Sequence, residues 1–275
     1  MIDLEVEYNN RARVPEHPQI FARWVREAAH IRSQRQSEWA LDIAYGSGER
    51  QRYDYLAAAG RSAGATLLFI HGGYWQSLGK STFSQVAHGA GSHGIDVAIA
   101  GYTLCPDNTI AGIIKEIQML IAHLAKRSSQ PLVVAGHSAG GHLAAVMAAC
   151  DWTVIAPDLG FDPVAAAVPI SGVFDLEPLI PTSINAKLGL DAREAEAVSP
   201  LFMPAPRGKR VVCVVGGKES PEFLRQQRVF VDNWGQRGSA IRGVELEGAD
   251  HFTVVDPLSD PDSDMTKAIV SLAVI

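Results

Sequence analysis

The sequence predicts an α/β fold in which helices cover both faces of a mostly parallel sheet. Apolar, strand-like segments alternate with amphipathic, helix-like segments along the chain, and this alternation is typical of parallel sheets. Residues 65–70 are almost continuously apolar, as expected for a strand that is buried on both faces. A third observation is the glycine-containing segment 136–140, which joins an apolar strand-like run to a helix of small residues.

The elements follow in order along the chain. Strands are predicted at 39–45, 52–57, 65–70, 95–101, 131–135, 164–170, 210–215 and 241–247. Helices are predicted at 15–36, 82–92, 109–126, 141–149, 221–237 and 264–273. Pro169 within the strand at 164–170 is unusual, because proline cannot donate a ladder hydrogen bond.

Length and composition indicate a single globular domain over residues 1–275. The chain is 47% hydrophobic and 20% charged, which suits one large α/β core. The helix at 15–36 is amphipathic and we expect it to lie near the mouth of the site. Residues 175–207 contain several prolines and are too few to bury a core of their own, so we expect an excursion over the active site.

Charge and cysteine content narrow the function classes. A net charge of −6 and the absence of a basic run disfavour nucleic acid and anionic membranes as partners, and favour a small-molecule substrate. An acidic, polar start and the lack of a long apolar run lead us to expect a cytoplasmic protein. Cys105, Cys150 and Cys213 are widely spaced and predict buried, reduced thiols without a metal site. The oligomeric state is not indicated.

The segment 136–140 reads Gly-His-Ser-Ala-Gly and lies between the predicted strand 131–135 and helix 141–149. This is the pattern of the nucleophile elbow of an α/β-hydrolase, in which a sharp strand-to-helix turn exposes a serine hydroxyl. Residues without a Cβ atom leave room for such a turn. The sequence therefore predicts Ser138 as the nucleophile.

A serine nucleophile needs a general base, and in this fold the histidine follows the serine and the acid in the chain. Two histidines follow Ser138, namely His142 and His251. His142 lies one helical turn beyond the serine, where its ring cannot readily reach the hydroxyl. His251 lies in the polar loop 247–252 after a predicted strand, so we predict that it is the base.

The acid is expected in the loop after the strand at 210–215, where Glu219 is the favoured candidate. Three alternatives remain open. Glu222 falls in the first turn of the next helix, where acidic residues are common. Asp250 is adjacent to His251 in the sequence, and Asp175 follows the preceding strand.

The oxyanion of an acyl-transfer reaction needs backbone N–H donors that are already in place. The segment 71–75, His-Gly-Gly-Tyr-Trp, directly follows the strand at 65–70, at the position of the His-Gly-Gly-Gly loop of lipases and esterases. We predict Gly73, Tyr74 and Ala139 as donors, with Gly72 as an alternative register. His71 is expected to anchor this loop.

The two aromatic side chains that follow the glycines of this loop are candidates for contact with the substrate. Tyr74 and Trp75 are predicted to form an aromatic wall of the substrate pocket, although core packing is an equal alternative for Trp75.

Several motifs together resemble the kynurenine formamidase (arylformamidase) branch of the α/β-hydrolases. They are His-Gly-Gly-Tyr-Trp-Gln at 71–76 with Lys80, Gly-Tyr-Thr-Leu-Cys-Pro at 101–106, Gly-His-Ser-Ala-Gly-Gly-His at 136–142, Ser-Gly-Val-Phe-Asp-Leu-Glu-Pro at 171–178 and Glu-Ser-Pro-Glu-Phe-Leu-Arg-Gln at 219–226. The resemblance implies hydrolysis of N-formyl-L-kynurenine to kynurenine and formate, with no metal or organic cofactor. It places the family's triad on Ser138, Glu219 and His251.

One residue departs from the pattern of this branch, because its members commonly carry aspartate where this chain has Glu219. Two alternative functions remain. The first is a short-chain carboxylesterase that uses the same residues. The second is a non-catalytic binding protein on the same fold, which is disfavoured because all three triad positions are filled.

Overall fold

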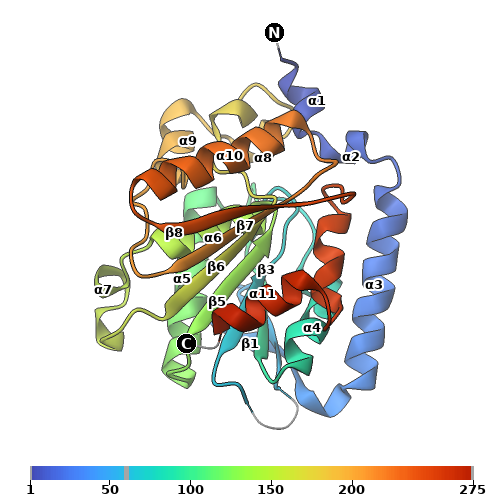
Figure 1. The fold of residues 1–275 in the computed structure, drawn as a ribbon, viewed down its shortest axis with the longest axis vertical. Helices are drawn as coiled ribbons and strands as arrows, with labels where there is room; N and C mark the ends of the chain where they lie inside the picture. The colour runs from blue at the N-terminus through green and yellow to red at the C-terminus, as the bar shows by residue number, and fades with distance from the viewer. Residues whose placement is uncertain (1, 59–61, 274–275) are drawn as a thin grey trace.

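The structure is a computed structural model that describes residues 2–58 and 62–273. Its centre is an eight-stranded sheet within these residues, with strand order β1-β2-β4-β3-β5-β6-β7-β8 (Figure 1). The strands are β1 (Trp39–Ala44), β2 (Arg52–Leu56), β3 (Thr66–Ile70), β4 (Asp96–Ala100), β5 (Leu132–His137), β6 (Val164–Ile170), β7 (Arg210–Gly216) and β8 (Ala240–Leu246).

The sheet is mostly parallel, as the sequence predicts. Strand β2 pairs in the antiparallel direction with both β1 and β4, and the strands from β4 to β8 run parallel to one another. The central strands β3 and β5 are buried along their whole length. Parallel strands end at one common edge of the sheet, so the loops that follow β3, β5, β6 and β7 can meet there.

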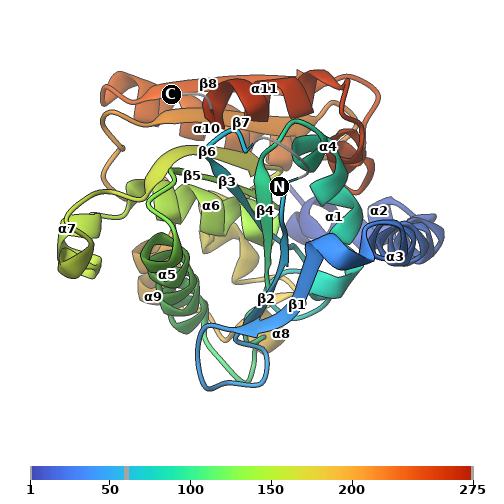
Figure 2. The same cartoon turned by 90° about the horizontal axis from the view of Figure 1, so that it is seen from below.

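Helices cover both faces of the sheet (Figure 2). Successive residues of β3 point to opposite sides. Leu67 and Phe69 pack in the layer under α4 (Ala87–Ser92) and α11 (Asp264–Ala273), whereas Leu68 and Ile70 pack under α5 (Ile110–Arg127) and α6 (Ala139–Ala149). The helices longer than four residues are α1 (Leu4–Tyr8), α3 (His17–Gln34), α4 (Ala87–Ser92), α5 (Ile110–Arg127), α6 (Ala139–Ala149), α9 (Ala192–Val198), α10 (Pro221–Gln236) and α11 (Asp264–Ala273).

The predicted helix at 82–92 is wrong in its first half. Only α4 is α-helical there, and it is preceded by two 3₁₀ turns, Lys80–Thr82 and Ser84–Val86. Within α4, close packing requires a glycine at position 89, where a Cβ atom would lie 2.4 Å from the Leu258 carbonyl oxygen. The glycine allows a tight contact between this segment and the C-terminal part of the chain, at the expense of helix propensity.

The segment 175–207 forms short turns rather than a layer of its own. It contains a 3₁₀ turn at Glu177–Leu179, the short helix α8 (Asn185–Leu188) and α9. Two helices near the N-terminus were not predicted, α1 and the four-residue α2 (Asn10–Arg13). Helix α1 contacts α10, so the start of the chain lies near the loop that follows β7 (Figure 1).

Cys105 and Cys213 are buried and Cys150 is half-buried, and all three are free thiols. In the described ranges, no helix combines the length and the apolar character needed to cross a bilayer.

Candidate active site

Ser138 lies at the sharp turn between β5 and α6, with φ 56° and ψ −116°. Such a positive φ is strained for a residue with a side chain. The flanking glycines are required by contact: a Cβ atom on Gly136 would lie 2.2 Å from the Gly140 carbonyl oxygen, and one on Gly140 would lie 1.9 Å from that of Ile70. The local geometry is therefore that of a nucleophile elbow.

His251 and Glu219 form a buried pair at the same edge of the sheet. His251 Nδ1 lies 2.6 Å from Glu219 Oε2, and both side chains are almost fully buried. The other carboxylate oxygen, Oε1, accepts a hydrogen bond of 2.8 Å from the backbone N–H of Gly216 and another from the Ser171 hydroxyl. Because a carboxylate can only accept, this arrangement places the proton of His251 on Nδ1 and leaves Nε2 as a base.

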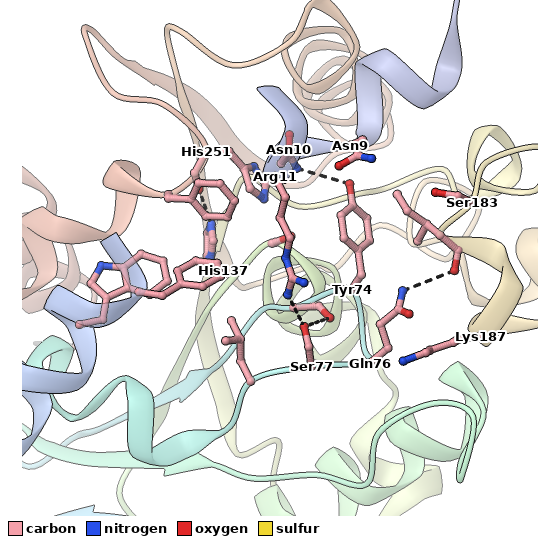
Figure 3. Close-up of a pocket in the computed structure, with 17 residues that line it drawn as sticks. Asn9, Asn10, Arg11, Tyr74, Gln76, Ser77, His137, Ser183, Lys187 and His251 are labelled. Carbon is pink, nitrogen blue, oxygen red and sulfur yellow. Dashed lines mark hydrogen bonds between the residues drawn. The ribbon is translucent and has the colours of Figure 1, made fainter. Parts of the chain in front are cut away.

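A cavity of about 250 Å³ lies at this edge of the sheet (Figure 3). Ser138 and His251 both line it, together with Gly73 and Tyr74 from the loop after β3. Within the described part of the chain, Ser138 Oγ makes no hydrogen bond. Catalytic hydrogen bonds are often completed only when a substrate binds.

The structure does not bring Glu222 to His251. Glu222 accepts two hydrogen bonds of 2.8 Å from Arg225 and one of 3.0 Å from the Tyr8 hydroxyl. The hydrogen bonds from Arg225 lower the pKa of the Glu222 carboxyl. Glu222 is thus engaged in holding α1 on α10.

Asp250 and Asp175 also have other partners. Asp250 Oδ1 accepts from the backbone N–H groups of Phe252 and Thr253, which makes the turn that carries His251. Asp175 Oδ1 accepts from the backbone N–H of Glu177 at 3.2 Å. Both carboxylates therefore form local turns.

The loop after β3 packs directly on the elbow. A Cβ atom on Gly72 would lie 2.7 Å from the His137 carbonyl oxygen and 3.1 Å from Ser138 Cβ. The backbone φ is 110° at Gly73 and 50° at Tyr74, and both residues line the cavity beside Ser138. Among the described residues no acceptor binds either N–H group. With Ala139 at the N-terminus of α6, these groups can serve as oxyanion donors.

Tyr74 and Trp75 have different surroundings. Tyr74 lines the cavity, and its hydroxyl donates a 2.6 Å hydrogen bond to the Tyr8 carbonyl oxygen. Trp75 is fully buried in the core, edge-on to His142 at 5.0 Å between ring centroids, and does not line the cavity. The expectation that Trp75 walls the pocket is therefore corrected, and core packing is its role.

Two other histidines of the motifs are structural. His71 Nδ1 lies 2.7 Å from the Gly72 carbonyl oxygen, and its ring stacks on Tyr102 at 4.3 Å. His142 Nε2 lies 2.7 Å from the Val198 carbonyl oxygen. Burial lowers the pKa of each histidine to about 4, so both are neutral at pH 7.

Sequence reasoning missed His137, which lines the cavity. Its Nε2 donates to the carbonyl oxygen of His251 at 2.7 Å, and the two rings lie 4.9 Å apart. Burial and the nearby His251 lower the pKa of His137 well below its usual value. A neutral His137 thus positions the loop of His251. The only signal in the sequence was its place directly before Ser138.

The segment 9–11 was also missed as part of the site. Asn9, Asn10 and Arg11, around the start of α2, line the cavity (Figure 3). Phe21 and Trp24 of α3, the helix predicted at 15–36, also line it. The Asn10 amide donates to the Tyr74 hydroxyl at 3.4 Å. In the described ranges, no three His, Cys, Asp or Glu side chains form a cluster that could hold a metal ion.

Comparisons with known proteins agree with this geometry. The sequence model of a family described as "alpha/beta hydrolase fold" matches residues 67–254. The chain is 26% identical to a kynurenine formamidase of Danio rerio over 84% of this chain and 81% of the relative, and 27% identical to one of Drosophila melanogaster over 92% and 88%.

A solved structure from Silicibacter sp. TM1040, a protein provisionally named a thioesterase, has a TM-score of 0.90 and 36% identity and covers 98% of this chain and 100% of that one. A hormone-sensitive lipase from a metagenome library shares the fold, with a TM-score of 0.68 and 20% identity over 86% of this chain and 83% of that one. The family match agrees with the elbow and with the order of the strands. The chain therefore belongs to the α/β-hydrolase family.

Proposed function

We propose that this protein is a serine hydrolase that cleaves a small acyl amide or ester, with N-formyl-L-kynurenine as the favoured substrate. The observation that carries the proposal is that Ser138, at a strained elbow, and His251, which is paired with the buried Glu219, both line one cavity. Relatives named kynurenine formamidase support the choice of substrate. The reaction would belong to tryptophan catabolism and needs no cofactor.

The geometry suits acyl transfer in two steps. His251 Nε2 takes the proton of Ser138 Oγ as the oxygen attacks the formyl carbon, and Glu219 stabilises the imidazolium that forms. The oxyanion accepts hydrogen bonds from the backbone N–H groups of Gly73, Tyr74 and Ala139. The C–N bond breaks when His251 passes its proton to the leaving nitrogen.

The second step reverses these roles. Water loses a proton to His251 as it attacks the formyl ester on Ser138, and the bond to Oγ breaks as His251 returns that proton to the serine. Formate is released and the free enzyme is restored.

The size of the cavity favours small substrates. At about 250 Å³ it lies at or below the lower end of the range for ligand pockets, roughly 300–1,000 Å³. A formyl or acetyl group with one aromatic leaving group suits this space better than a long acyl chain. The relative provisionally named a thioesterase favours a second candidate, a short-chain esterase that uses the same residues.

A substrate panel separates the two candidates. We expect kcat/KM to be highest for N-formyl-L-kynurenine and to fall steeply from p-nitrophenyl acetate to butyrate and hexanoate, because a filled pocket excludes added methylenes. Hydrolysis of p-nitrophenyl butyrate or hexanoate without any turnover of N-formyl-L-kynurenine would reject the formamidase proposal and leave the esterase proposal.

Ser138→Ala tests the nucleophile itself. We expect kcat to fall about a thousandfold or more, since the remaining binding and oxyanion groups catalyse only weakly. Intact mass should show one adduct of an organophosphonate on the wild type and none on the variant, while thermal unfolding stays similar. A variant that kept more than about a tenth of the activity would exclude Ser138 as the nucleophile.

A further inference from the structure

The cavity is basic in a chain whose net charge is −6. Its lining contains no aspartate or glutamate among the described residues, but it contains two cationic side chains, Arg11 and Lys187. Arg11 belongs to α2 and Lys187 to α8, so the two cations come from segments far apart in the sequence. A local excess of positive charge at the substrate cavity points to an anionic ligand.

Arg11 is held over the cavity by neutral groups. Its Nη2 donates a 2.9 Å hydrogen bond to the Ser77 hydroxyl, and its guanidinium carbon lies 5.8 Å from the centre of the Phe21 ring. Figure 3 shows the side chain reaching from the N-terminal segment to Ser77. Ser77 Oγ in turn donates to the Gly73 carbonyl oxygen at 3.0 Å, in the loop of the oxyanion donors.

No carboxylate pairs with Arg11 within the described residues, which distinguishes it from several other arginines. Arg23 pairs with Asp256 at 2.7 Å and Arg225 with Glu222 at 2.8 Å. A guanidinium has five N–H donors in a planar fork, and the Ser77 bond uses one of them. The others are available to a ligand that enters the cavity.

Lys187 stands across the cavity from Arg11, near Gln76, in Figure 3. It is exposed, and no ion pair with it is formed in the described ranges. An exposed ammonium contributes mainly to the field that attracts an anion, whereas the guanidinium can bind a carboxylate through two parallel hydrogen bonds.

We propose that the leaving group of the substrate carries a carboxylate, which Arg11 binds while Lys187 strengthens the local positive field. The inference rests on the proposed hydrolase function and deepens it, since it assigns a substrate class and a residue that determines specificity. N-formyl-L-kynurenine meets the requirement, and simple alkyl and nitrophenyl esters do not.

The test compares substrates that differ only in charge. One pair is N-formyl-L-kynurenine and its α-carboxamide, and a second pair is 3-acetoxybenzoate and 3-acetoxybenzamide. For the wild type we expect kcat/KM to favour the carboxylate of each pair that is hydrolysed. In Arg11→Gln this preference should fall about tenfold, mainly through KM, as expected for the loss of one charge-assisted contact near the surface.

Two variants control the experiment. Arg13 lies on the same short helix and is exposed but does not line the cavity, so Arg13→Gln should leave the preference unchanged. Arg11→Lys keeps the charge without the fork and should restore part of the preference. A wild-type preference below about threefold, or an equal preference in wild type and Arg11→Gln, would overturn the proposal.

Binding separates this inference from the hydrolase proposal. Calorimetry with L-kynurenine and its carboxamide requires no turnover, and we expect the carboxylate to bind about tenfold more weakly to Arg11→Gln than to the wild type. If no substrate is hydrolysed but this difference appears, the hydrolase proposal fails and the anion site stands. Equal binding of the carboxylate to both proteins would exclude the anion site.

Discussion

Glu219 is the residue at which this chain departs from the aspartate common in the branch it resembles. Its two oxygens have separate tasks: Oε2 binds His251, and Oε1 accepts from the Gly216 N–H and the Ser171 hydroxyl. The additional methylene is thus accommodated by anchoring one oxygen to the end of β7. We infer that the longer acid orients His251 as an aspartate would.

Exchange of this carboxylate for an amide tests the assignment. Glu219→Gln should reduce kcat by about a hundredfold or more, because an amide cannot hold His251 in the required tautomer and would meet the donors on its other side. Glu222→Gln is the matched control, since it alters a second buried glutamate of the same segment and should cost less than about fivefold. The assignment is wrong if Glu222→Gln or Asp175→Asn is the most damaging of the three.

At the residue scale, the chain order identified the groups that the structure brings together. The elbow motif selected Ser138, and the order of serine, acid and histidine selected Glu219 and His251. The same reasoning could not find Arg11, because its relevance depends on a short helix from the far end of the chain. Trp75 was misplaced because adjacent residues of a turn can have different surroundings, and the sequence does not tell which of them faces the cavity.

At the scale of elements, the N-terminal segment joins two parts of the site through Tyr8. The Tyr8 carbonyl oxygen accepts from the Tyr74 hydroxyl at 2.6 Å, and the Tyr8 hydroxyl accepts from Gln226 at 2.9 Å and donates to Glu222. Helices α1 and α2 are too short to be stable alone. These contacts therefore determine where the segment lies.

Tyr74→Phe should loosen this segment without removing the Tyr74 backbone donor. The loss of the hydroxyl leaves the Tyr8 carbonyl oxygen unpaired, at a cost of about 1 kcal/mol. We expect faster hydrogen exchange over residues 4–13 and a higher KM for N-formyl-L-kynurenine. Tyr45→Phe removes a comparable 2.7 Å bond to the Gly101 carbonyl oxygen away from the cavity, and it should leave exchange in 4–13 unchanged. Equal exchange there in both variants would contradict this role.

Elements with a clear apolar pattern were predictable, and elements without one were not. Helix α5 shows a continuous apolar stripe, and β3 and β5 are short apolar runs, so period and length were sufficient to assign them. Helices α1 and α2 are too short to show such a period. Tertiary contacts stabilise them instead. The prediction at 82–92 failed only in its first half, where two 3₁₀ turns precede α4.

For the whole molecule, the free energy of unfolding depends on pH through three buried, neutral histidines, which are His71, His137 and His142. Burial lowers the pKa of His71 and His142 to about 4, below the value near 6.5 of an unfolded chain. Between these values the unfolded state binds more protons than the folded state, so the free energy of unfolding rises with pH. This stabilisation is present above about pH 6.5 and is lost as the pH falls toward 4.

Urea unfolding at pH 7.0 and pH 5.5 measures this effect. We expect the free energy of unfolding to be smaller at pH 5.5 by on the order of 2–4 kcal/mol, because each such histidine contributes about 1 kcal/mol over this interval. His142→Gln can keep the bond to the Val198 carbonyl oxygen but cannot titrate, so its pH dependence should be weaker by about 1 kcal/mol. An identical dependence in the variant would show that His142 is not involved.

The position of Arg11 has a consequence for how members of this family diverge. The family match spans residues 67–254, which includes the serine, the acid, the histidine and the oxyanion loop. The side chain that we assign to the anionic group lies outside this span, on a helix of four residues. A change of substrate would then require no alteration of the reaction centre itself. Replacing the first two dozen residues of one member by those of another should exchange their preferences, which makes this segment a natural starting point for engineering new hydrolases on this scaffold.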